Sequence, residues 1–262
     1  MHENRILLED SGAGISTIVI NRPEQRNAID LEMWHRLAQV IALLQDDDET
    51  RVVVMRGAGD NAFASGADIS ELRLLTDREN HMRRSELRDA VFSAITNCRC
   101  PVIAMVNGFC IGAGCQLALA CDLRIASDRS KFGIPAAKLG VVSSYSMTQR
   151  LVASVGPVAA KEILLIGEPI DAQRALQIGL VNRVVPSEFL AEVTYGIARV
   201  IAGNAPLSVH AAKRMIAKCL SYQEGIDHSD VDELEFQAFQ SEDAAEGLRS
   251  FLEKRKPRWV GR

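Results

Sequence analysis

The chain has 262 residues, of which 47% are hydrophobic and 24% are charged, and its formal net charge at pH 7 is −4. These values are ordinary for a globular protein made of one domain, or of one domain with an appendage. The acidic balance, with a calculated pI of about 5.8, argues against a protein that binds nucleic acid through bulk electrostatics. We therefore expect no nucleic-acid partner.

Cysteine usage and the N-terminal sequence indicate the compartment. Most of the six cysteines lie in or beside apolar segments, where a free thiol behaves as a small hydrophobic side chain. The spacing in Cys98-Arg99-Cys100 is too short for a zinc knuckle and has no matching second pair. The first residues form no apolar signal core. We expect reduced thiols, no bound metal and a cytoplasmic location.

A long apolar stretch from Pro101 to Ala126 has the length of a membrane span. Polar and charged residues interrupt it, namely Asn107, Gln116, Asp122 and Arg124. These interruptions exclude a membrane-spanning helix, so no membrane partner is expected.

The first half of the chain alternates strand patterns with helix patterns. Residues 5–9 and 15–21 predict a β-hairpin around the turn at 11–14. Asp30 is predicted to cap a helix over 31–45 that has one apolar face. Continuous apolar runs predict buried strands at 52–55, 102–106, 123–126 and 180–185. Short buried strands separated by helices favour parallel pairing with right-handed crossovers, and hence an α/β fold.

Strand patterns end near Ser187, and the remaining sequence predicts helices at 188–202, 206–221, 227–240 and 244–254. No linker rich in Gly, Ser and Pro separates the two regions. We therefore expect a core over residues 1–187 with a helical appendage over 188–262, rather than two independent domains.

Two glycine-containing turns carry the clearest functional signal, one over Phe63–Asp68 and the other over Gly108–Gln116. Small residues let backbone N–H groups be exposed where no side chain obstructs them. The second turn joins an apolar strand to a helix predicted over 115–120, and a helix N-terminus favours a negative oxygen. Two such donors meeting at one point would form an oxyanion hole.

In this order, several further motifs make the chain resemble the crotonase (enoyl-CoA hydratase/isomerase) superfamily over essentially its whole length. They are Asn21-Arg22-Pro23 with Asn27-Ala28, the Phe63–Asp68 turn, Pro101–Gly108, Ala120–Ala126, Gly179–Val185 and the segment from Glu242 to Arg255. The resemblance implies a spiral core of repeated ββα units and C-terminal helices that build homotrimers, often paired into hexamers. It also implies an acyl-CoA thioester as ligand, with no metal and no redox cofactor.

By resemblance, the backbone amides of Ala67 and Ala113 form the hole for the thioester oxygen. Ala64, Asp68 and Ile69 lie where the family holds the adenine end of CoA. We also expect Asp68 to brace its turn by accepting backbone N–H bonds. Lys254 opens a basic run at 254–258, which is either a solvated tail or a phosphate contact.

The chain departs from the family where carboxylates are expected. The two glutamates of family hydratases correspond to Gln116 and Ala136, and the aspartate of some relatives corresponds to Ser144. A general acid or base contributes roughly a hundred- to ten-thousand-fold in rate, and neither glutamine nor alanine accepts a proton near neutral pH. Hydration by the usual two-glutamate mechanism is therefore expected to be impaired.

Other polar residues are possible substitutes. The cluster Ser143-Ser144-Tyr145-Ser146 falls in the expected acyl pocket, where a hydroxyl could position water and Tyr145 could donate a proton. Alternatively, Ser144 is a helix N-cap. Glu71, Glu86 and His81 are expected on a solvated helix face, and Asp122 and Arg124 in structural pairs.

Two main hypotheses follow for the function. The first is a lyase or isomerase that stabilises a thioester enolate, for which decarboxylation or retro-aldol cleavage would need the hole more than a base. The second is a catalytically degenerate protein that binds acyl-CoA without turnover. RNA binding is a weaker third hypothesis, which the acidic net charge disfavours.

Overall fold

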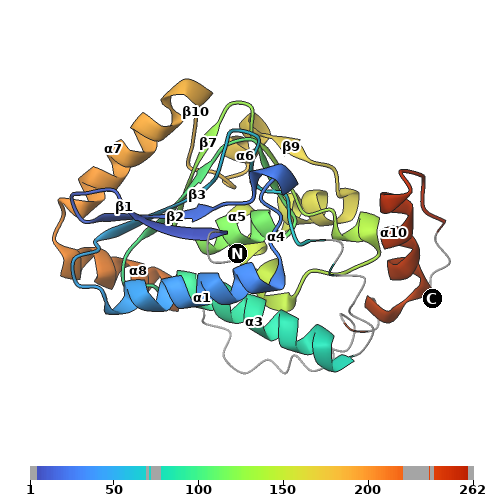
Figure 1. Ribbon diagram of the computed structural model, residues 1–262. Coiled ribbons are helices and arrows are strands. Elements are labelled where there is room, and N and C mark those ends of the chain that lie inside the picture. The colour runs from blue at the N-terminus through green and yellow to red at the C-terminus, as the bar shows by residue number, and fades with distance from the viewer. Residues whose placement is uncertain (1–4, 69–70, 72–77, 221–235, 237–238, 259–262) are drawn as a thin grey trace.

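Two sheets with helices packed around them make up the protein, as seen in a computed structural model (Figure 1). The structure describes residues 5–68, 71, 78–220, 236 and 239–258. The larger sheet has the strand order β1-β2-β3-β5-β7-β10. Its strands are β1 (Ile6–Asp10), β2 (Ile15–Ile20), β3 (Val52–Gly57), β5 (Val102–Val106), β7 (Leu123–Ser127) and β10 (Arg183–Val185).

The smaller sheet has the order β4-β6-β8-β9, with β4 (Ala62–Ala64), β6 (Phe109–Ile111), β8 (Lys131–Gly133) and β9 (Ile170–Asp171). Three times, a strand of the larger sheet leads into a strand of the smaller sheet and then to a helix. The helices are α3 (Arg78–Thr96), α4 (Ala113–Ala120) and α5 (Tyr145–Lys161). This is the ββα repeat that the resemblance implied, so the predicted α/β crotonase-type core is confirmed.

The N-terminal predictions hold because local sequence and packing agree. Strands β1 and β2 pair antiparallel, whereas β2, β3, β5, β7 and β10 pair parallel. Helix α1 (Leu31–Asp46) begins at the Asp30 cap, whose carboxylate accepts the Met33 N–H at 2.9 Å. Trp34 of α1 is also buried and meets Phe92 of α3 edge-on, with the ring centroids 5.4 Å apart.

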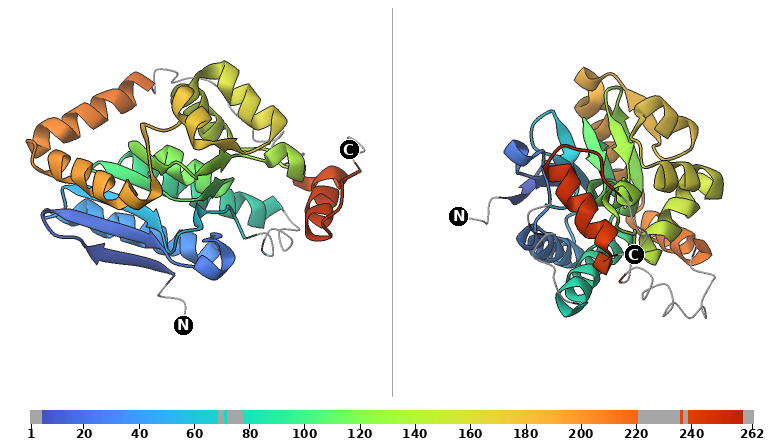
Figure 2. Two further views of the ribbon diagram at one scale, coloured as in Figure 1. Left: turned by 90° about the horizontal axis from the view of Figure 1, so that it is seen from above. Right: turned by 90° about the vertical axis from the view of Figure 1, so that its right-hand side faces the viewer.

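Helices cover both faces of the larger sheet. Helices α1 and α3 run along one face, and α7 (Leu190–Ala202) lies over the other (Figures 1 and 2). The larger cluster of buried side chains fills the space toward α1, α3, α4 and α5. A smaller cluster under α7 joins residues such as Val52, Ile103 and Ile125 to Ala198. Strands buried on both faces explain the continuous apolar runs of the sequence.

In the C-terminal half, three helices lie close to predicted ones: α7, α8 (Pro206–Leu220) and α10 (Glu242–Leu252). Helix α6 (Ala172–Gln177) was not predicted. Short helical turns lie at Pro23–Gln25, Ala136–Leu139 (η2) and Ser187–Phe189, and a π-helical turn at Glu162–Ile166. Most of the helix predicted over 227–240 lies outside the described residues.

One strand prediction was too long. The run 180–185 predicted a strand throughout, but β10 covers only Arg183–Val185. Leu180 and Val181 are buried outside the sheet and belong to the larger cluster. The exposed residues Asn182 and Arg183 separate this buried pair from Val184 and Val185. The apolar residues on both sides did not distinguish a strand from a packed connection.

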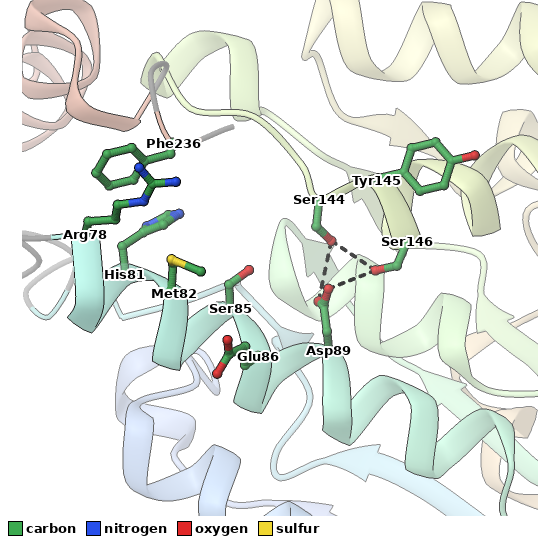
Figure 3. Close-up of a pocket in the computed structure, with 10 residues that line it drawn as sticks. All are labelled: Arg78, His81, Met82, Ser85, Glu86, Asp89, Ser144, Tyr145, Ser146 and Phe236. Atoms are coloured by element: carbon green, nitrogen blue, oxygen red, sulfur yellow. Dashed lines mark hydrogen bonds between the residues drawn. The ribbon is translucent and has the colours of Figure 1, made fainter. Parts of the chain in front are cut away.

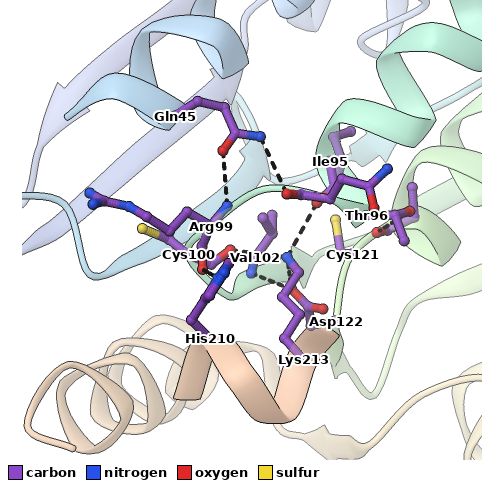
Figure 4. Close-up of polar contacts among 12 residues, drawn as sticks. Gln45, Ile95, Thr96, Arg99, Cys100, Val102, Cys121, Asp122, His210 and Lys213 are labelled. Carbon is purple, nitrogen blue, oxygen red and sulfur yellow. Dashed lines mark hydrogen bonds and ion pairs between the residues drawn. The ribbon is translucent and has the colours of Figure 1, made fainter. Parts of the chain in front are cut away.

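A buried polar cluster attaches α8 to the sheet (Figure 4). Lys213 of α8 donates to Asp122 at 2.7 Å and to the carbonyls of Cys100 and Ile95 at 3.0 and 3.3 Å. Asp122 also accepts the Val102 N–H at 2.7 Å. Arg124 donates instead to backbone carbonyls, including that of Leu180 at 2.6 Å. Asp122 and Arg124 are therefore structural, as expected, but each has partners of its own.

All six cysteines are free thiols, and Cys219 alone among them is exposed. Burial raises the pKa of the Cys121 thiol to about 12, which makes it an inert packing group. Among the described helices, none has the length and apolar character to cross a membrane; the stretch 101–126 is divided among β5, β6, α4 and β7.

Candidate active site

The two glycine turns meet, because parallel pairing of β4 with β6 places the ends of these strands next to each other. A carbon added at Gly66 would lie 3.3 Å from the Ile111 carbonyl oxygen and 3.8 Å from the Ala113 nitrogen. One added at Gly112 would lie 3.7 Å from the Gly66 Cα. The residues that precede Ala67 and Ala113 therefore touch, although they are far apart in sequence.

The amide of Ala67 is left unpaired by the way its turn is held. Ile29 donates its N–H to the Gly66 carbonyl at 2.8 Å and accepts the Asp68 N–H at 3.0 Å. This parallel bridge uses the groups on either side of Ala67. Within the described residues, the Ala67 N–H has no backbone acceptor.

Among the described residues, the Ala113 N–H also has no backbone acceptor, but for a different reason. Helix α4 begins at Ala113, with Gly112 (φ 55°) as its N-cap. The N–H of a first helical residue has no partner inside the helix and lies at the positive end of its dipole. The predicted helix start at Cys115 was two residues late, because Gly112 and Gly114 lowered the helix propensity of the sequence. Within the described part of the chain, the Ala67 and Ala113 N–H groups therefore lie on adjacent backbone segments without a backbone acceptor. An oxyanion hole formed by these two groups stays a prediction.

Close backbone approach explains why glycine occurs in and beside these turns. A Cβ at Gly114 would lie 2.2 Å from the Ala64 carbonyl oxygen, and one at Gly108 would lie 2.1 Å from that of Asn61. Neither contact is possible for a larger residue without moving the backbone. The glycines thus fix the separation of the two turns.

The residues expected at the adenine end of CoA differ in their surroundings. Ala64 is fully buried in β4. The Asp68 carboxylate pairs with Arg22 at 2.6 Å, so Asp68 braces its turn through this ion pair and through the backbone bond to Ile29. Ile69 lies outside the described residues. Lys254 is exposed just after α10, in a left-handed conformation (φ 52°).

The two positions where the resemblance implied glutamates in relatives carry neutral residues. Gln116, on the first turn of α4, is 6% exposed and donates to the Ser143 hydroxyl at 3.4 Å. Ala136 begins the helical turn η2 and packs against the larger hydrophobic cluster. Both side chains are neutral, so these positions provide no proton acceptor of the expected kind.

A cavity of about 360 Å³ opens between α3 and the start of α5 (Figure 3). Side chains of α3 form one wall, and the predicted polar cluster forms the other. The cavity is lined by Arg78, His81, Met82, Ser85, Glu86, Asp89, Ser144, Tyr145, Ser146 and Phe236. Of the predicted cluster Ser143–Ser146, the last three residues line this cavity. The placement of the cluster in an acyl pocket stays a prediction.

The capping alternative for Ser144 is correct in position but wrong in the bond that its side chain makes. Ser144 occupies the N-cap position of α5 but makes no capping bond with its side chain. Its hydroxyl donates to Asp89 Oδ1 at 3.4 Å and lies 3.2 Å from the Ser146 hydroxyl. Ser146 donates to Asp89 Oδ2 at 3.0 Å. The Ser144 hydroxyl thus donates its proton to a carboxylate of a distant helix, and its oxygen accepts no N–H of the first turn of α5.

The Tyr145 hydroxyl is directed away from the cluster of Asp89, Ser144 and Ser146 in Figure 3. A proton-donating role for Tyr145 stays a prediction.

The expected solvated face of polar residues is only partly correct. Glu86 is exposed. Glu71, however, accepts the Arg84 guanidinium at 2.6 Å and the Leu31 N–H at 2.9 Å, so it helps start α1. His81 is partly buried with its ring centroid 4.1 Å from that of Phe239. Burial, assisted by the charge of Arg88, lowers the pKa of His81.

Asp89 is the site residue that the sequence analysis missed. It belongs to α3, follows Arg88 and precedes the buried pair Val91 and Phe92. In the sequence, the only indication that Asp89 faces inward was its position about one helical turn before Phe92, on the face of α3 that approaches the core. No local motif connects it with Ser144, because the two meet only through packing of α3 against α5.

Comparison with known proteins agrees with the crotonase-type core. Residues 10–262 match the model of the family Enoyl-CoA hydratase/isomerase. The short-chain-enoyl-CoA hydratase of Clostridium acetobutylicum is 37% identical over 258 residues, which are 98% of this chain and 97% of the relative.

Two solved structures are also similar. An enoyl-CoA hydratase/carnithine racemase from Magnetospirillum magneticum is 36% identical, with a TM-score of 0.81 over 99% of this chain and 96% of its own. A methylmalonyl-CoA decarboxylase in complex with 2-nitronate-propionyl-CoA is 28% identical, with a TM-score of 0.89 over 99% of both chains. The fold and site thus define a crotonase-type protein. The chain belongs to the enoyl-CoA hydratase/isomerase family.

Proposed function

We propose that this protein acts on an acyl-CoA thioester as a lyase or isomerase, by forming an enolate whose oxygen is held by the N–H groups of Ala67 and Ala113. The observation that carries this proposal is the pair of unpaired amides on touching turns. The thioester oxygen gains negative charge as the enolate forms, so fixed donors stabilise the transition state more than the substrate. One such donor contributes roughly a hundred- to a thousand-fold in rate.

The side chains beside these donors favour reactions that generate the enolate by breaking a carbon–carbon bond. Gln116 and Ala136 offer no base for activating water. Loss of an α-carboxylate as CO₂, or retro-aldol cleavage, needs no base at those positions. The similarity to methylmalonyl-CoA decarboxylase supports this choice.

Hydration of an enoyl-CoA is the second candidate. It is supported by the names of curated relatives, such as the short-chain-enoyl-CoA hydratase. Under this alternative, water must be activated by a group other than Gln116 or Ala136. A third outcome, binding of acyl-CoA without turnover, would make the protein a degenerate family member.

The proposal includes CoA as part of the substrate, no separate cofactor, and association of this chain into trimers or hexamers in the cytoplasm. Exposed apolar side chains on the C-terminal helices support the association; they are Val200, Leu207, Met215 and Ile216. Sedimentation velocity would measure the oligomer.

Mass spectrometry of CoA thioesters incubated with the protein in D₂O tests the reaction. The panel comprises crotonyl-, methylmalonyl- and hydroxyacyl-CoA. We expect CO₂ loss from methylmalonyl-CoA or chain cleavage of hydroxyacyl-CoA. The rate of either reaction should fall at least about a hundredfold in Ala67→Pro, which lacks one N–H donor. Ala67→Ser keeps the N–H and serves as the matched control.

Three results would change the conclusion. Rapid water addition to crotonyl-CoA would favour hydration. Binding without any turnover would favour the degenerate protein. Turnover that is equal in Ala67→Pro and Ala67→Ser would overturn the oxyanion hole.

A further inference from the structure

We propose that Asp89 is the catalytic acid and base of this site, and that Ser144 and Ser146 hold its carboxylate toward the substrate. This inference rests on the proposed function, because it supplies the proton-transfer group that an enolate mechanism requires. Asp89 lies on α3. The positions where the resemblance implied carboxylates, Gln116, Ala136 and Ser144, lie on other elements.

The first argument is that Asp89 is held and also reachable. Its two carboxylate oxygens accept from two hydroxyls of another element, at 3.4 Å from Ser144 and 3.0 Å from Ser146. The Arg88 Nε lies 3.5 Å from Oδ1. The Asp89 side chain nevertheless keeps 32% exposure and lines the cavity. A carboxylate that is oriented by its neighbours and open to a ligand is suited to proton transfer.

The second argument is continuity with the oxyanion turns. Gln116 lies one helical turn beyond Ala113 and donates to Ser143 at 3.4 Å. Ser143 precedes Ser144, whose hydroxyl donates to Asp89 (Figure 3). Gln116, beside one donor of the hole, thus contacts Ser143, and the next residue along the chain, Ser144, contacts Asp89.

The third argument comes from the other groups around the cavity. Glu86 is exposed and lies one turn earlier on α3, and His81 is stacked on Phe239. Arg150 of α5 interacts electrostatically with Asp89. Of these groups, Asp89 is the carboxylate that the structure fixes through side chains of the facing helix.

The chemistry is a reversible proton transfer. The ionised Asp89 removes the α-proton of the thioester, and the C–H electron pair becomes the carbon–carbon double bond of the enolate. The carbonyl oxygen becomes the oxyanion held by Ala67 and Ala113. In the reverse direction, the Asp89 carboxylic acid returns a proton to the α-carbon. When CO₂ is lost, the proton that the product gains reaches Asp89 from solvent.

Exchange of the α-hydrogens of butyryl-CoA in D₂O tests this step directly. After Asp89 has removed an α-proton, its carboxylic acid exchanges that proton for solvent deuterium and returns deuterium to the α-carbon. The wild type should incorporate deuterium. Asp89→Asn should lower the rate constant for exchange at least about a hundredfold, while the KM for butyryl-CoA changes less than threefold. Asp89→Glu should restore part of the rate. Replacing both serines, Ser144→Ala and Ser146→Ala, should cost about tenfold through lost orientation.

Glu79→Gln is the matched control, since Glu79 is an exposed carboxylate of the same helix that pairs with Arg83. It should exchange as the wild type does. Equal exchange in wild type and Asp89→Asn would overturn the inference. Loss in Glu86→Gln with no loss in Asp89→Asn would overturn it as well. A third result would also overturn it, by showing that Asp89 is purely structural. In that case Asp89→Asn would lose exchange, melt at a lower temperature than the wild type and have a raised KM, and Asp89→Glu would not recover the rate.

The proposed function fails separately. If Ala67→Pro exchanges or turns over substrate as fast as the wild type, the oxyanion hole is wrong whatever Asp89 does. If the wild type cleaves a thioester in a manner that depends on Ala67 but shows no exchange, the role of Asp89 is wrong and the hole remains. A wild type with neither exchange nor turnover overturns both proposals.

Discussion

The paired turns and the wall between α3 and α5 contribute to the site in different ways. The turns offer backbone N–H groups, and their geometry is fixed by glycines whose missing side chains let two segments touch. The wall offers side chains, and Asp89 meets Ser144 and Ser146 only because two helices pack together. A backbone site tolerates changes of side chain but not of backbone shape, whereas a side-chain site changes with single substitutions.

This difference has a consequence for family members. Under the proposed function, the same pair of turns stabilises an enolate oxygen whichever groups transfer the proton. The identity of the reaction therefore depends on the wall and on positions such as Gln116 and Ala136. Similarity in fold is therefore stronger evidence that two proteins share the turns than that they catalyse the same reaction.

The largest effect is expected from a substitution that separates the two turns. In Gly114→Ala, the new Cβ would lie 2.2 Å from the Ala64 carbonyl oxygen, so the turns must separate. A displacement of about 1 Å costs roughly a hundredfold in activity, and overpacking costs about 1–3 kcal/mol of stability. Turnover assays and urea denaturation measure the two losses.

Gly196→Ala is the matched control, because Gly196 lies in α7 and an added Cβ meets nothing within 4 Å. Its activity should not change, and its stability should rise by about 0.5–1 kcal/mol through helix propensity. If Gly114→Ala behaved like this control, the turns would not need their close contact.

An intermediate effect sharpens the comparison by adding carboxylates beside intact turns. Gln116→Glu combined with Ala136→Glu should raise the rate of crotonyl-CoA hydration about a hundredfold, because each position then carries a potential general acid or base. Spectrophotometric loss of the enoyl absorbance measures the rate. The single variants are the controls. No gain in the double variant, at unchanged melting temperature, would show that these positions do not face the reacting carbons.

The smallest expected effect concerns the edge of the wall. Burial lowers the pKa of His81 in the folded protein, so the unfolded chain binds the proton more tightly. Stability should therefore be complete above the unfolded pKa of about 6.5 and should decrease as the pH falls below it. His81→Phe should remove this part of the pH dependence.

Urea denaturation at pH 7.5 and pH 5.5 measures the effect of His81. The difference in unfolding free energy between the two pH values should be smaller in His81→Phe than in the wild type. His35→Phe, on the exposed side of α1, is the control that should retain the wild-type difference.

Much of the scaffold was predictable because the relevant forces are local. The hairpin, the Asp30 cap and the strands at 52–55 and 102–106 follow from turn residues, capping and apolar runs. The glycines of the two turns predicted exposed N–H groups, because the conformation of a turn also depends on its own residues. The strand over 180–185 was overextended because apolar character records burial without recording hydrogen bonding.

The sequence by itself determined most strands of the larger sheet, the two turns and the absence of glutamate at positions 116 and 136, and its resemblance to the family implied the ββα scaffold. Only the tertiary structure decided that Ala113 starts α4, that Ser144 bonds a side chain instead of capping its helix, and that Asp89 lines the cavity. The physical reason is that a turn depends on its own residues. The neighbours of a side chain such as Asp89 depend on how helices far apart in the sequence pack around the common core.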